Sequence, residues 1–352
     1  MISAEILADS KNQFGDRLTT FKVTLPRIIL AELNTHRMFS RNSASSRAIP
    51  FEKMVESVEK NPFIPIAWQK DHKGMQGTEY FNDDADIAMR RFEWVSVRDF
   101  AIMRAKILNI NNVTKQICNR LLEPFMWHTV ILTSSAEGLE NFFKLRCPKY
   151  TSSTGETYRS KKDWITDNTY NVEPDSLPNV NNVVGWLNLN KGQSEIHMMA
   201  LAEAMWDQYQ SSTPKVLKKG DWHIPFGDNI NEDKLEDILR GPYRASYIRH
   251  DGDIEKAKIE IAVARCARVS YTTFGEDKID NYEADIKLYD RLLQSGHMSP
   301  MEHVARAMTN EEYQSFYRGE GANEGHTGRK ENQGWCLNFK GFIQQRYLIE
   351  NV

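Results

Sequence analysis

The sequence has few cysteines, and their positions do not suggest a metal site or a disulfide framework. Cys118, Cys147, Cys266 and Cys336 are the only four among 352 residues, and no two of them form a CxxC pair. This usage is typical of a reducing compartment, so we expect a cytoplasmic protein with buried thiols and no bound metal. Cys147 could be considered as a nucleophile, but the sequence identifies no partner histidine, and a lone cysteine is weak evidence.

Long apolar runs and an excess of positive charge are also missing. No segment approaches the roughly 18 apolar residues that a membrane-spanning helix needs. The start, "MISAEILADS", lacks the basic stretch followed by an apolar one that is typical of a secretory signal. The net charge of −3 gives no support to a protein that coats nucleic acid, although a local basic pocket stays compatible with it. We therefore expect neither a membrane nor a nucleic acid as partner.

The composition is that of an ordinary globular protein, and the length allows a sizeable core. Residues 18–33 read as a strand that becomes helical after Pro26, which suits a first helical turn. Apolar spacing predicts helices at about 84–119, 135–145, 194–210, 253–269 and 280–296, the last with Gly296 as its stop signal. We expect a single domain over residues 1–352, with an inserted loop at about 150–192 and a glycine-rich loop at about 319–334.

The most informative stretch is "LNTHRMFSRNSASSRAIP", residues 33–50. It contains three arginines, one histidine and several small polar residues, with no acidic residue between His36 and Arg47. Arginine pairs bidentately with phosphate, and hydroxyls and turn amides add neutral donors. The stretch therefore suggests a site for the phosphates of a nucleotide or cofactor. The alternative is a solvated loop whose arginines pair with surface acids.

Two further segments contain residues of chemical interest. "SGHMSPMEH", residues 295–303, carries His297, Glu302 and His303, but Pro300 interrupts it and the spacing is not the HExxH pattern of a zinc site. It reads instead as a helix start with an acid in its first turn. "NFFKLRCP", residues 141–148, places Arg146 at the end of a predicted helix, where a cation also suits the helix dipole.

Taken together, these segments resemble a known family. "THRMFSRNSASSR" resembles the arginine–histidine–arginine signature of the flavin-dependent thymidylate synthases, and "TTFKVTLPRIILAEL" resembles the strand, proline and helix that precede it. "NRLLEPF", "NFFKLR" and "QSEIHMMALAEAM" resemble later segments of that family. "ARCARVSY" and "LLQSGHMSPMEH" resemble two segments that precede the signature in the family but follow it here, so the chain looks circularly permuted. Termini that lie close together make such a permutation tolerable.

The signature itself departs from the family pattern. Its first arginine is replaced by Thr35, its glutamate by Ser43, its glycine by Ser46 and its tyrosine by Ala48. The glutamine of the preceding helix is replaced by Glu32. Because some of these positions contact flavin and nucleotide in the family, the changes put the identity of the base in doubt.

The resemblance implies an α+β fold with a mixed sheet and long flanking helices. It also implies a homo-oligomer, tetramer or dimer, that makes thymidylate from dUMP. Such an enzyme uses 5,10-methylenetetrahydrofolate as carbon donor and FAD, reduced by NADPH, as hydride source. Carried over by position, the implied catalytic residues are His297 and Arg146. The implied cofactor-binding residues are His36, Arg37, Ser40, Asn42, Asn141 and His303. The implied substrate-binding residues are Glu32, Ser45, Ser46, Arg47, Arg120 and Arg146.

Alternatives remain open within this resemblance. The same fold could act on dCMP or transfer a hydroxymethyl group, since the carboxylate of Glu32 only accepts hydrogen bonds where an amide also donates them. A non-catalytic nucleotide-binding homologue is the third possibility. In addition, Gln344, Gln345 and Arg346 near the C-terminus could supply the amide and guanidinium that Glu32 and Thr35 no longer provide. The alternative is a polar surface stripe on a terminal helix.

Overall fold

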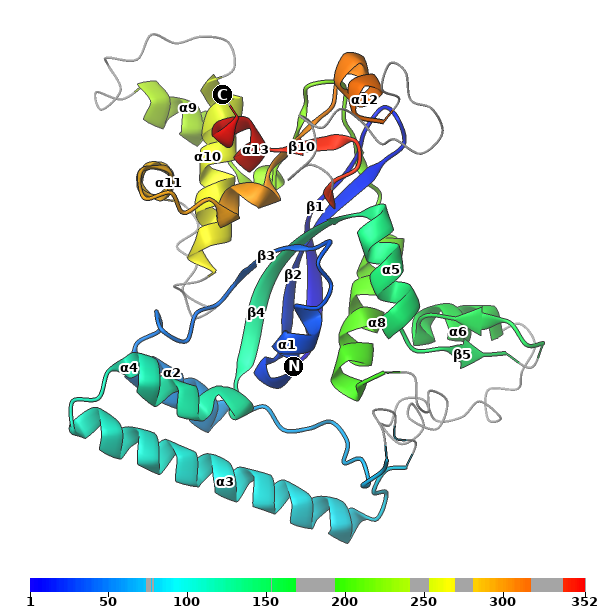
Figure 1. The fold of residues 1–352 in the computed structure, drawn as a ribbon, viewed down its shortest axis with the longest axis vertical. Coiled ribbons are helices and arrows are strands. Elements are labelled where there is room, and N and C mark those ends of the chain that lie inside the picture. Colours follow the sequence, from blue (N-terminus) through cyan, green and yellow to red (C-terminus); the bar gives the residue numbers. More distant parts are fainter. Residues whose placement is uncertain are drawn as a thin grey trace.

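A five-stranded sheet lies at the centre of the computed structural model (Figure 1). The model describes residues 1–73, 77, 79–152, 154–168, 194–240, 253–269, 281–317 and 338–351. The strand order is β3-β4-β2-β1-β7, with bounds Ser40–Ser43, Trp127–Ser135, Arg17–Pro26, Ser3–Lys11 and Lys215–Val216. All neighbours are antiparallel except β1 and β7, which are parallel. The prediction of an α+β fold with a mixed sheet and long flanking helices is confirmed.

The two faces of the sheet have different chemistry because successive side chains of a strand point to opposite faces. Phe21, Val23 and Leu25 of β2 pack with β4 residues against helices α5 (Ala136–Arg146) and α8 (Ile196–Ser211). Both helices were predicted from apolar spacing, and Figure 1 shows them together on this side of the sheet. The opposite face presents Thr20 of β2 and Thr133 of β4, both fully buried. One face is therefore an ordinary apolar core, and the other carries buried polar groups.

The transition after β2 follows the predicted pattern. Pro26 ends the strand with φ −61°, and the chain continues as the 3-10 turn η1 (Arg27–Ile29) and the short helix α1 (Leu30–Leu33). Ile29 and Leu33 are buried in the apolar core, which holds this helix against the sheet. The polar stretch that follows α1 keeps His36 and Phe39 buried and then joins the sheet as β3.

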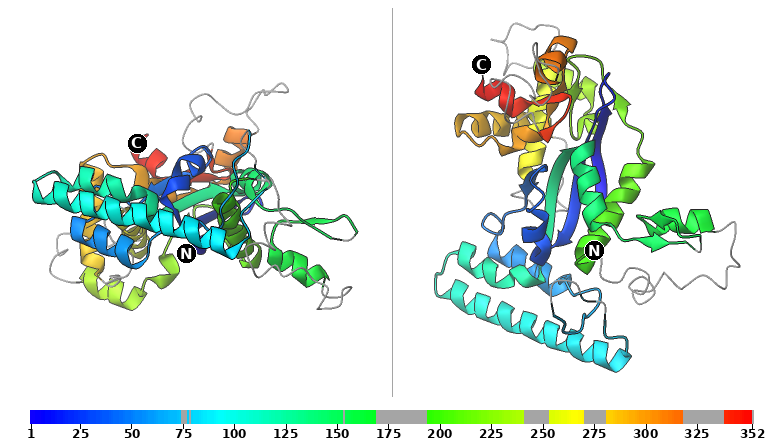
Figure 2. Two further views of the ribbon diagram at one scale, coloured as in Figure 1. Left: turned by 90° about the horizontal axis from the view of Figure 1, so that it is seen from below. Right: turned by 45° about the vertical axis from the view of Figure 1, so that its right-hand side comes forward.

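A separate helical layer lies beyond one end of the sheet (Figures 1 and 2). It contains α2, α3, α4 and the 3-10 helix η2, with bounds Phe51–Lys60, Asp84–Ile110, Lys115–Cys118 and Asn119–Phe125. Asp83 caps α3, since its Oδ1 accepts hydrogen bonds from the backbone amides of Ala85 and Asp86. The helix predicted over 84–119 is interrupted after Ile110, where α3 ends.

Within the described residues no helix is long and apolar enough to cross a membrane.

The C-terminal half adds helices and a small sheet against the polar face. The helices are η4, α9, α10, α11, η6, α12 and α13, with bounds Gly227–Asn229, Glu232–Arg240, Asp253–Arg268, Tyr282–Gln294, Ser299–His303, Asn310–Tyr317 and Gln345–Glu350. The sheet has the order β10-β9-β8, with bounds Phe342–Gln344, Ala305–Ala307 and Trp222–His223. As predicted, α11 is followed by Gly296, which has φ +69°. The segment η6 packs against β3, α10 and α13.

The predicted loop at about 150–192 is wrong for its first part. Residues 150–168 form a hairpin of β5 (Tyr150–Thr151) and β6 (Thr157–Tyr158), followed by α6 (Lys161–Asn168). Trp164 of α6 packs with Tyr150 and Met199, which supplies the tertiary contact that the local sequence pattern does not reveal. The rest of that segment and the predicted glycine-rich loop at 319–334 lie outside the described residues.

Gly341 gives a test of how the C-terminal strand is joined to the first turn of the chain. It has φ +75°, and an added Cβ would lie 2.1 Å from Nδ2 of Asn12 and 2.5 Å from Oδ2 of Asp16. Gly341→Ala should lower the free energy of unfolding by about 2–4 kcal/mol, from backbone strain plus steric overlap. Gly220→Ala is the matched control, because Gly220 also has positive φ but no atom within 4 Å of the added Cβ. Urea unfolding of both variants measures the difference, and equal losses would contradict the described contact.

Candidate functional site

Arg146 joins three segments that are far apart in the sequence. Its Nε donates a hydrogen bond to Nε2 of His36 over 3.1 Å, and its Nη1 donates to Oγ of Ser194 over 3.2 Å. Arg146 is the last residue of α5, which ends there because Cys147 is extended and precedes a proline. The end of α5 therefore connects the stretch after α1 with the residues just before α8.

His36 takes part in this contact as a neutral imidazole. Its ring packs against Phe39 and Phe142, with ring centroids 5.8 and 4.9 Å apart. The pKa of His36 is lowered to about 4. Burial is the largest cause, and the positive charges of Arg146 and Arg41 contribute to the same lowering. The Nε2 atom is then free of a proton and accepts from Arg146, so the proton of the neutral ring lies on Nδ1.

Glu195 is held in place by two contacts at the start of α8. Its Oε2 accepts a hydrogen bond from the amide of Met198 at 2.8 Å, and its Oε1 lies 2.6 Å from Nδ1 of His197. Because Nε2 of His197 accepts from the amide of Ile66, the ring proton lies on Nδ1 and is donated to Glu195. Sequence reasoning singled out the surrounding segment through the family resemblance but missed Glu195 as a site residue.

Glu32 completes a group that we call the arginine–glutamate cluster: Glu32, His36, Arg146, Ser194 and Glu195. Partial burial raises the pKa of Glu32, the nearby charge of Glu195 raises it further, and Arg146 and His197 lower it. The two described hydrogen bonds of Arg146 use two of the five N–H donors of its guanidinium. The cluster can therefore donate to a carbonyl or anionic oxygen and accept from an N–H of the same ligand.

A second group lies on the polar face of the sheet, and we call it the buried polar cluster: Ser40, Asn42, Thr133, His303 and Gln344. Nε2 of Gln344 donates to Oγ of Ser40 at 3.0 Å, and Oγ1 of Thr133 lies 2.8 Å from Nδ1 of His303. Three buried atoms of this cluster have no hydrogen-bond partner within the described residues: Nδ2 of Asn42, Nε2 of His303 and Oε1 of Gln344. Such atoms in a folded protein call for a bound ligand or ordered water.

His303 is also the end of a buried chain of hydrogen bonds that involves residues of four strands, β1, β8, β2 and β4. From Ser10 on β1 the chain runs to Nδ1 of His223 (2.8 Å), from Nε2 of His223 to Thr20 (2.8 Å), on to Thr133 (2.7 Å) and to Nδ1 of His303 (2.8 Å). Burial lowers the pKa of His223 to about 4 and that of His303 to about 3. Both rings are therefore neutral at physiological pH.

Because each neutral ring carries one N–H proton, only two arrangements of the protons satisfy every hydrogen bond of the chain. Either all donors point from Ser10 toward His303, which puts the ring proton of His303 on Nε2, or all point the other way, which leaves Nε2 as an acceptor. If the two rings had protons on Nε2 of His223 and Nδ1 of His303 together, one threonine hydroxyl would have a proton without an acceptor. The tautomers of His223 and His303 are therefore coupled through Thr20 and Thr133.

Arg41, between Ser40 and Asn42 in sequence, and Glu302, next to His303, interact electrostatically with each other. Nη1 of Arg41 donates to the carbonyl of Leu33 at 3.3 Å, burial lowers the pKa of Arg41, and Glu302 raises it in part. Arg346 forms ion pairs with Glu302 at 2.7 Å and with Glu350 at 3.1 Å. Arg346 is thus engaged with two carboxylates, whereas Gln344 is the C-terminal residue that contacts the signature stretch, at Ser40.

The remaining predicted residues are not joined to either cluster. Within the described residues, no side-chain hydrogen bond or ion pair connects the clusters with Arg37, Ser45, Arg47, Arg120, Asn141 or His297, and all of these except Ser45 are exposed. Ser46 has a structural contact instead, since its Oγ donates to Glu123 at 2.9 Å. Nδ2 of Asn119 donates to the carbonyl of Ser46, which holds the segments that carry Arg47 and Arg120 next to each other.

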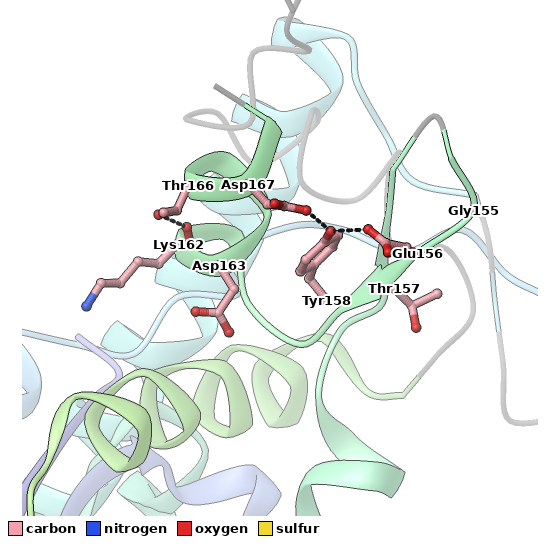
Figure 3. A pocket seen from close by; sticks show the side chains of 8 residues that line it. All are labelled: Gly155, Glu156, Thr157, Tyr158, Lys162, Asp163, Thr166 and Asp167. Carbon is pink, nitrogen blue, oxygen red and sulfur yellow. Dashed lines mark hydrogen bonds between the residues drawn. The ribbon is translucent and has the colours of Figure 1, made fainter. Parts of the chain in front are cut away.

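Two other features do not belong to the candidate site. Burial raises the pKa of the Cys147 thiol, so that a thiolate nucleophile at this position is disfavoured. An open hollow of about 1040 Å³ lies between the β5–β6 hairpin and α6 (Figure 3). It is lined by Tyr158, Asp167 and their neighbours, and none of the predicted site residues faces it.

Comparison with known proteins gives weak similarities. No protein-family model matches the chain, and no curated protein matches its sequence. Among solved structures, a UMP/dUMP methylase PolB from Streptomyces cacaoi bound with 5-Br dUMP aligns with 15% identity over 55% of this chain and 65% of that chain, at TM-score 0.37. The flavin-dependent thymidylate synthase ThyX from Helicobacter pylori, complexed with FAD and dUMP, aligns with 16% identity over 55% of this chain and 67% of that chain, at TM-score 0.29. With TM-scores below 0.5, these alignments do not establish a common fold.

The protonation state of His36 can be measured directly. Its folded-state pKa of about 4 lies below the usual value near 6.5, so the unfolded chain binds the proton more readily. This residue should therefore make the protein less stable as the pH falls from about 6.5 to 4, by up to about 1.4 kcal/mol per pH unit. In an NMR titration of labelled histidine, His36 should stay neutral down to pH 5. Arg146→Met should raise its pKa, but not to 6.5 because burial remains, whereas titration of His36 near 6.5 in the wild type would contradict the described contact.

The buried hydrogen-bond chain predicts a contrast between two substitutions of Thr133. Thr133→Val keeps the shape but leaves a partner atom on both Thr20 and His303 without its hydrogen bond, which should cost about 1–3 kcal/mol of unfolding free energy. Thr133→Ser keeps the hydroxyl and loses one buried methyl group, at about 1 kcal/mol. Chemical denaturation compares the two. A Val variant as stable as the Ser variant would mean that the chain of hydrogen bonds is not formed.

Proposed function

We propose that the chain binds a pyrimidine deoxynucleotide beside a flavin and transfers a one-carbon unit to the base, most simply converting dUMP to dTMP. The observation that supports this proposal is the contact of Arg146 with His36 and Ser194. It brings together three of the sequence segments that resemble the flavin-dependent thymidylate synthases. Arg146 lies 110 residues after His36 and 48 residues before Ser194, and the convergence of these segments does not follow from composition or helix spacing.

The arginine–glutamate cluster is the proposed site for the pyrimidine base. The N–H donors of Arg146 that its described contacts leave over suit a ring carbonyl, and Glu32 suits a ring N–H or amino group. The exposed guanidinium groups of Arg47 and Arg120, with the hydroxyl of Ser45, are proposed to bind the phosphate. Ser46 is assigned a supporting role, because its hydroxyl is engaged with Glu123.

The buried polar cluster suits one edge of a flavin. The free Nδ2 of Asn42 is a donor, Oε1 of Gln344 is an acceptor and Nε2 of His303 is either, and a flavin ring offers both carbonyls and ring nitrogens to such groups. Ser40 of this cluster, together with His36, Arg37 and Asn141, is proposed to contact other parts of FAD. FAD, reduced by NADPH, would supply the hydride and 5,10-methylenetetrahydrofolate the carbon. His297 is proposed to lie near the flavin and folate.

A second candidate function follows from Glu32. A carboxylate whose pKa is raised can accept a hydrogen bond from the exocyclic amino group of a cytosine, or in its protonated form donate to a carbonyl. Action on dCMP, or transfer of a hydroxymethyl group, is therefore the alternative to thymidylate synthesis. A non-catalytic nucleotide-binding protein is the third outcome that the experiment must distinguish.

The proposal is tested by turnover with a mass-spectrometric readout. The protein is supplied with FAD, NADPH and 5,10-methylenetetrahydrofolate and offered dUMP and dCMP separately. We expect a product 14 mass units heavier than dUMP, the difference between uracil and thymine nucleotides. A methylated or hydroxymethylated cytosine product would establish the second function. Absence of any product, together with absence of bound flavin, would contradict the proposed enzyme.

A variant of Arg146 relates any activity to the described geometry. Arg146→Met should lower kcat/KM by roughly 10- to 100-fold, since a hydrogen bond from a charged donor is worth about 1.5–3 kcal/mol. Arg291→Met, at an exposed position on α11 outside both clusters, is the matched control and should leave kcat/KM unchanged. Equal activity of the two variants would place the substrate elsewhere.

A further inference from the structure

The helix α3 is apolar on two opposite faces. One face packs on the helical layer through Trp94, Ala101, Ile102, Ala105 and Leu108. The other presents a row of large apolar side chains to solvent: Met89, Phe92, Phe100, Met103, Ile107 and Ile110. Phe92 is 68% exposed and Ile110 is 78% exposed. Single exposed apolar residues are common, but a continuous row of this kind marks an interaction surface.

The row has the spacing of a helix-pairing surface. Starting at Met89, its members follow at steps of three or four residues, with Ser96 at the step between Phe92 and Phe100. The extra four-residue step is of the kind that locally interrupts a heptad repeat without moving the stripe off one face. With 27 residues, α3 is about 40 Å long, so the stripe extends along most of a straight surface. In Figure 2, α3 lies at the lower edge of the molecule in the right view and in front of the other elements in the left view, which is seen from below.

We propose that this stripe pairs with the same stripe of a second copy of the chain, with the two α3 helices antiparallel across a two-fold axis near Phe100. In that register Met89 packs beside the partner's Ile110, and Phe92 packs beside the partner's Ile107. Ser96 lies beside the partner's Met103, and the two Phe100 rings meet at the axis. Every large apolar residue of the row thereby obtains an apolar or small neighbour, as an isologous interface requires.

The charges beside the stripe favour this orientation. Glu93 and Arg104 lie on the same edge of the stripe, and the proposed register places Glu93 next to the partner's Arg104, twice per pair by symmetry. Within the described residues Glu93 has no ion pair, and Arg104 lies over its own Phe100 at 4.8 Å. In a parallel pair the two charges would be about 16 Å apart along the helix, too far to interact directly.

Other charged residues of α3 do not compete for these positions. Lys106 is paired with Glu59 at 2.7 Å, Arg98 with Asp99 at 2.6 Å, and Arg90 with Asp86 at 2.9 Å, all within one chain. Asp84 and Arg91 lie on the side of the helix away from the stripe, so Glu93 and Arg104 are the pair of opposite charges beside the stripe that can select the partner's orientation. This complementarity of the stripe with itself is why we assign it to a second copy, and the inference does not depend on the proposed enzymatic function.

The test is a sedimentation-velocity measurement of the whole chain and four variants at micromolar concentration. The wild type should sediment as a dimer or a multiple of a dimer. Phe100→Glu should halve the mass, since it places two carboxylates at the two-fold axis. Glu93→Arg and Arg104→Glu should each raise the dissociation constant of the dimer roughly tenfold. The double variant should restore the wild-type dissociation constant, because the two reversed charges again meet opposite charges. Val216→Glu, at an exposed apolar residue outside α3, should have no effect.

Specific outcomes would overturn the proposal. A monomeric wild type would mean that the stripe is not a self-association surface. An oligomer that Phe100→Glu leaves intact would place the interface elsewhere. Charge reversals that the double variant does not rescue would exclude the antiparallel register. As an independent readout, Met89→Cys combined with Ile110→Cys should give an interchain disulfide under mild oxidation, whereas Met89→Cys alone should not.

Discussion

The guanidinium of Arg146 can donate to His36 only while that imidazole is uncharged. Burial between Phe39 and Phe142 keeps the ring neutral, and the cation of Arg146 reinforces this state. The same guanidinium holds Ser194 at the entrance to α8. The proposed base site therefore depends on a neutral histidine that accepts a hydrogen bond from a fixed cation, with Glu32 and Glu195 supplying negative charge nearby.

The two faces of the central sheet carry different groups. On one face, Phe21 and Val23 of β2 join α5 and α8 in a close-packed core, which fixes the position of Arg146 at the end of α5. On the other face, the hydrogen-bond chain between His223 and His303 is buried and closed except at Nε2 of His303. A change of tautomer at one end must reach the other through the two threonines, which connects β8 with the buried polar cluster.

The elements that could be predicted from the sequence are those set by local signals. Pro26 marks the change from strand to helix, apolar spacing marks α5 and α8, and Gly296 marks the end of α11. The hairpin and α6 after Tyr150 were missed, because two-residue strands give no periodicity and Trp164 is held by tertiary contacts. The uninterrupted helix expected beyond Ile110 was likewise wrong, since the chain turns at Asn111 and at Asn112, which has φ +61° and ends the helix.

The site was predictable only in part, for a related reason. Glu32, His36 and Arg146 were chosen by resemblance, and the structure brings them together. Glu195 was missed because its role as a helix cap and as a partner of His197 depends on the fold around it. The contact of Gln344 with Ser40 joins residues 304 positions apart, and no local pattern predicts such a contact.

The central claim is that a pyrimidine nucleotide binds at the contact between Arg146 and His36. It is tested most directly by titrating dUMP into protein labelled with ¹⁵N-histidine and following the ring resonances of each histidine. The account predicts a saturable change at His36, while His128, whose ring is buried beside Arg27, stays unchanged. Saturable binding of dUMP without any change at His36, or no binding at all, would contradict it.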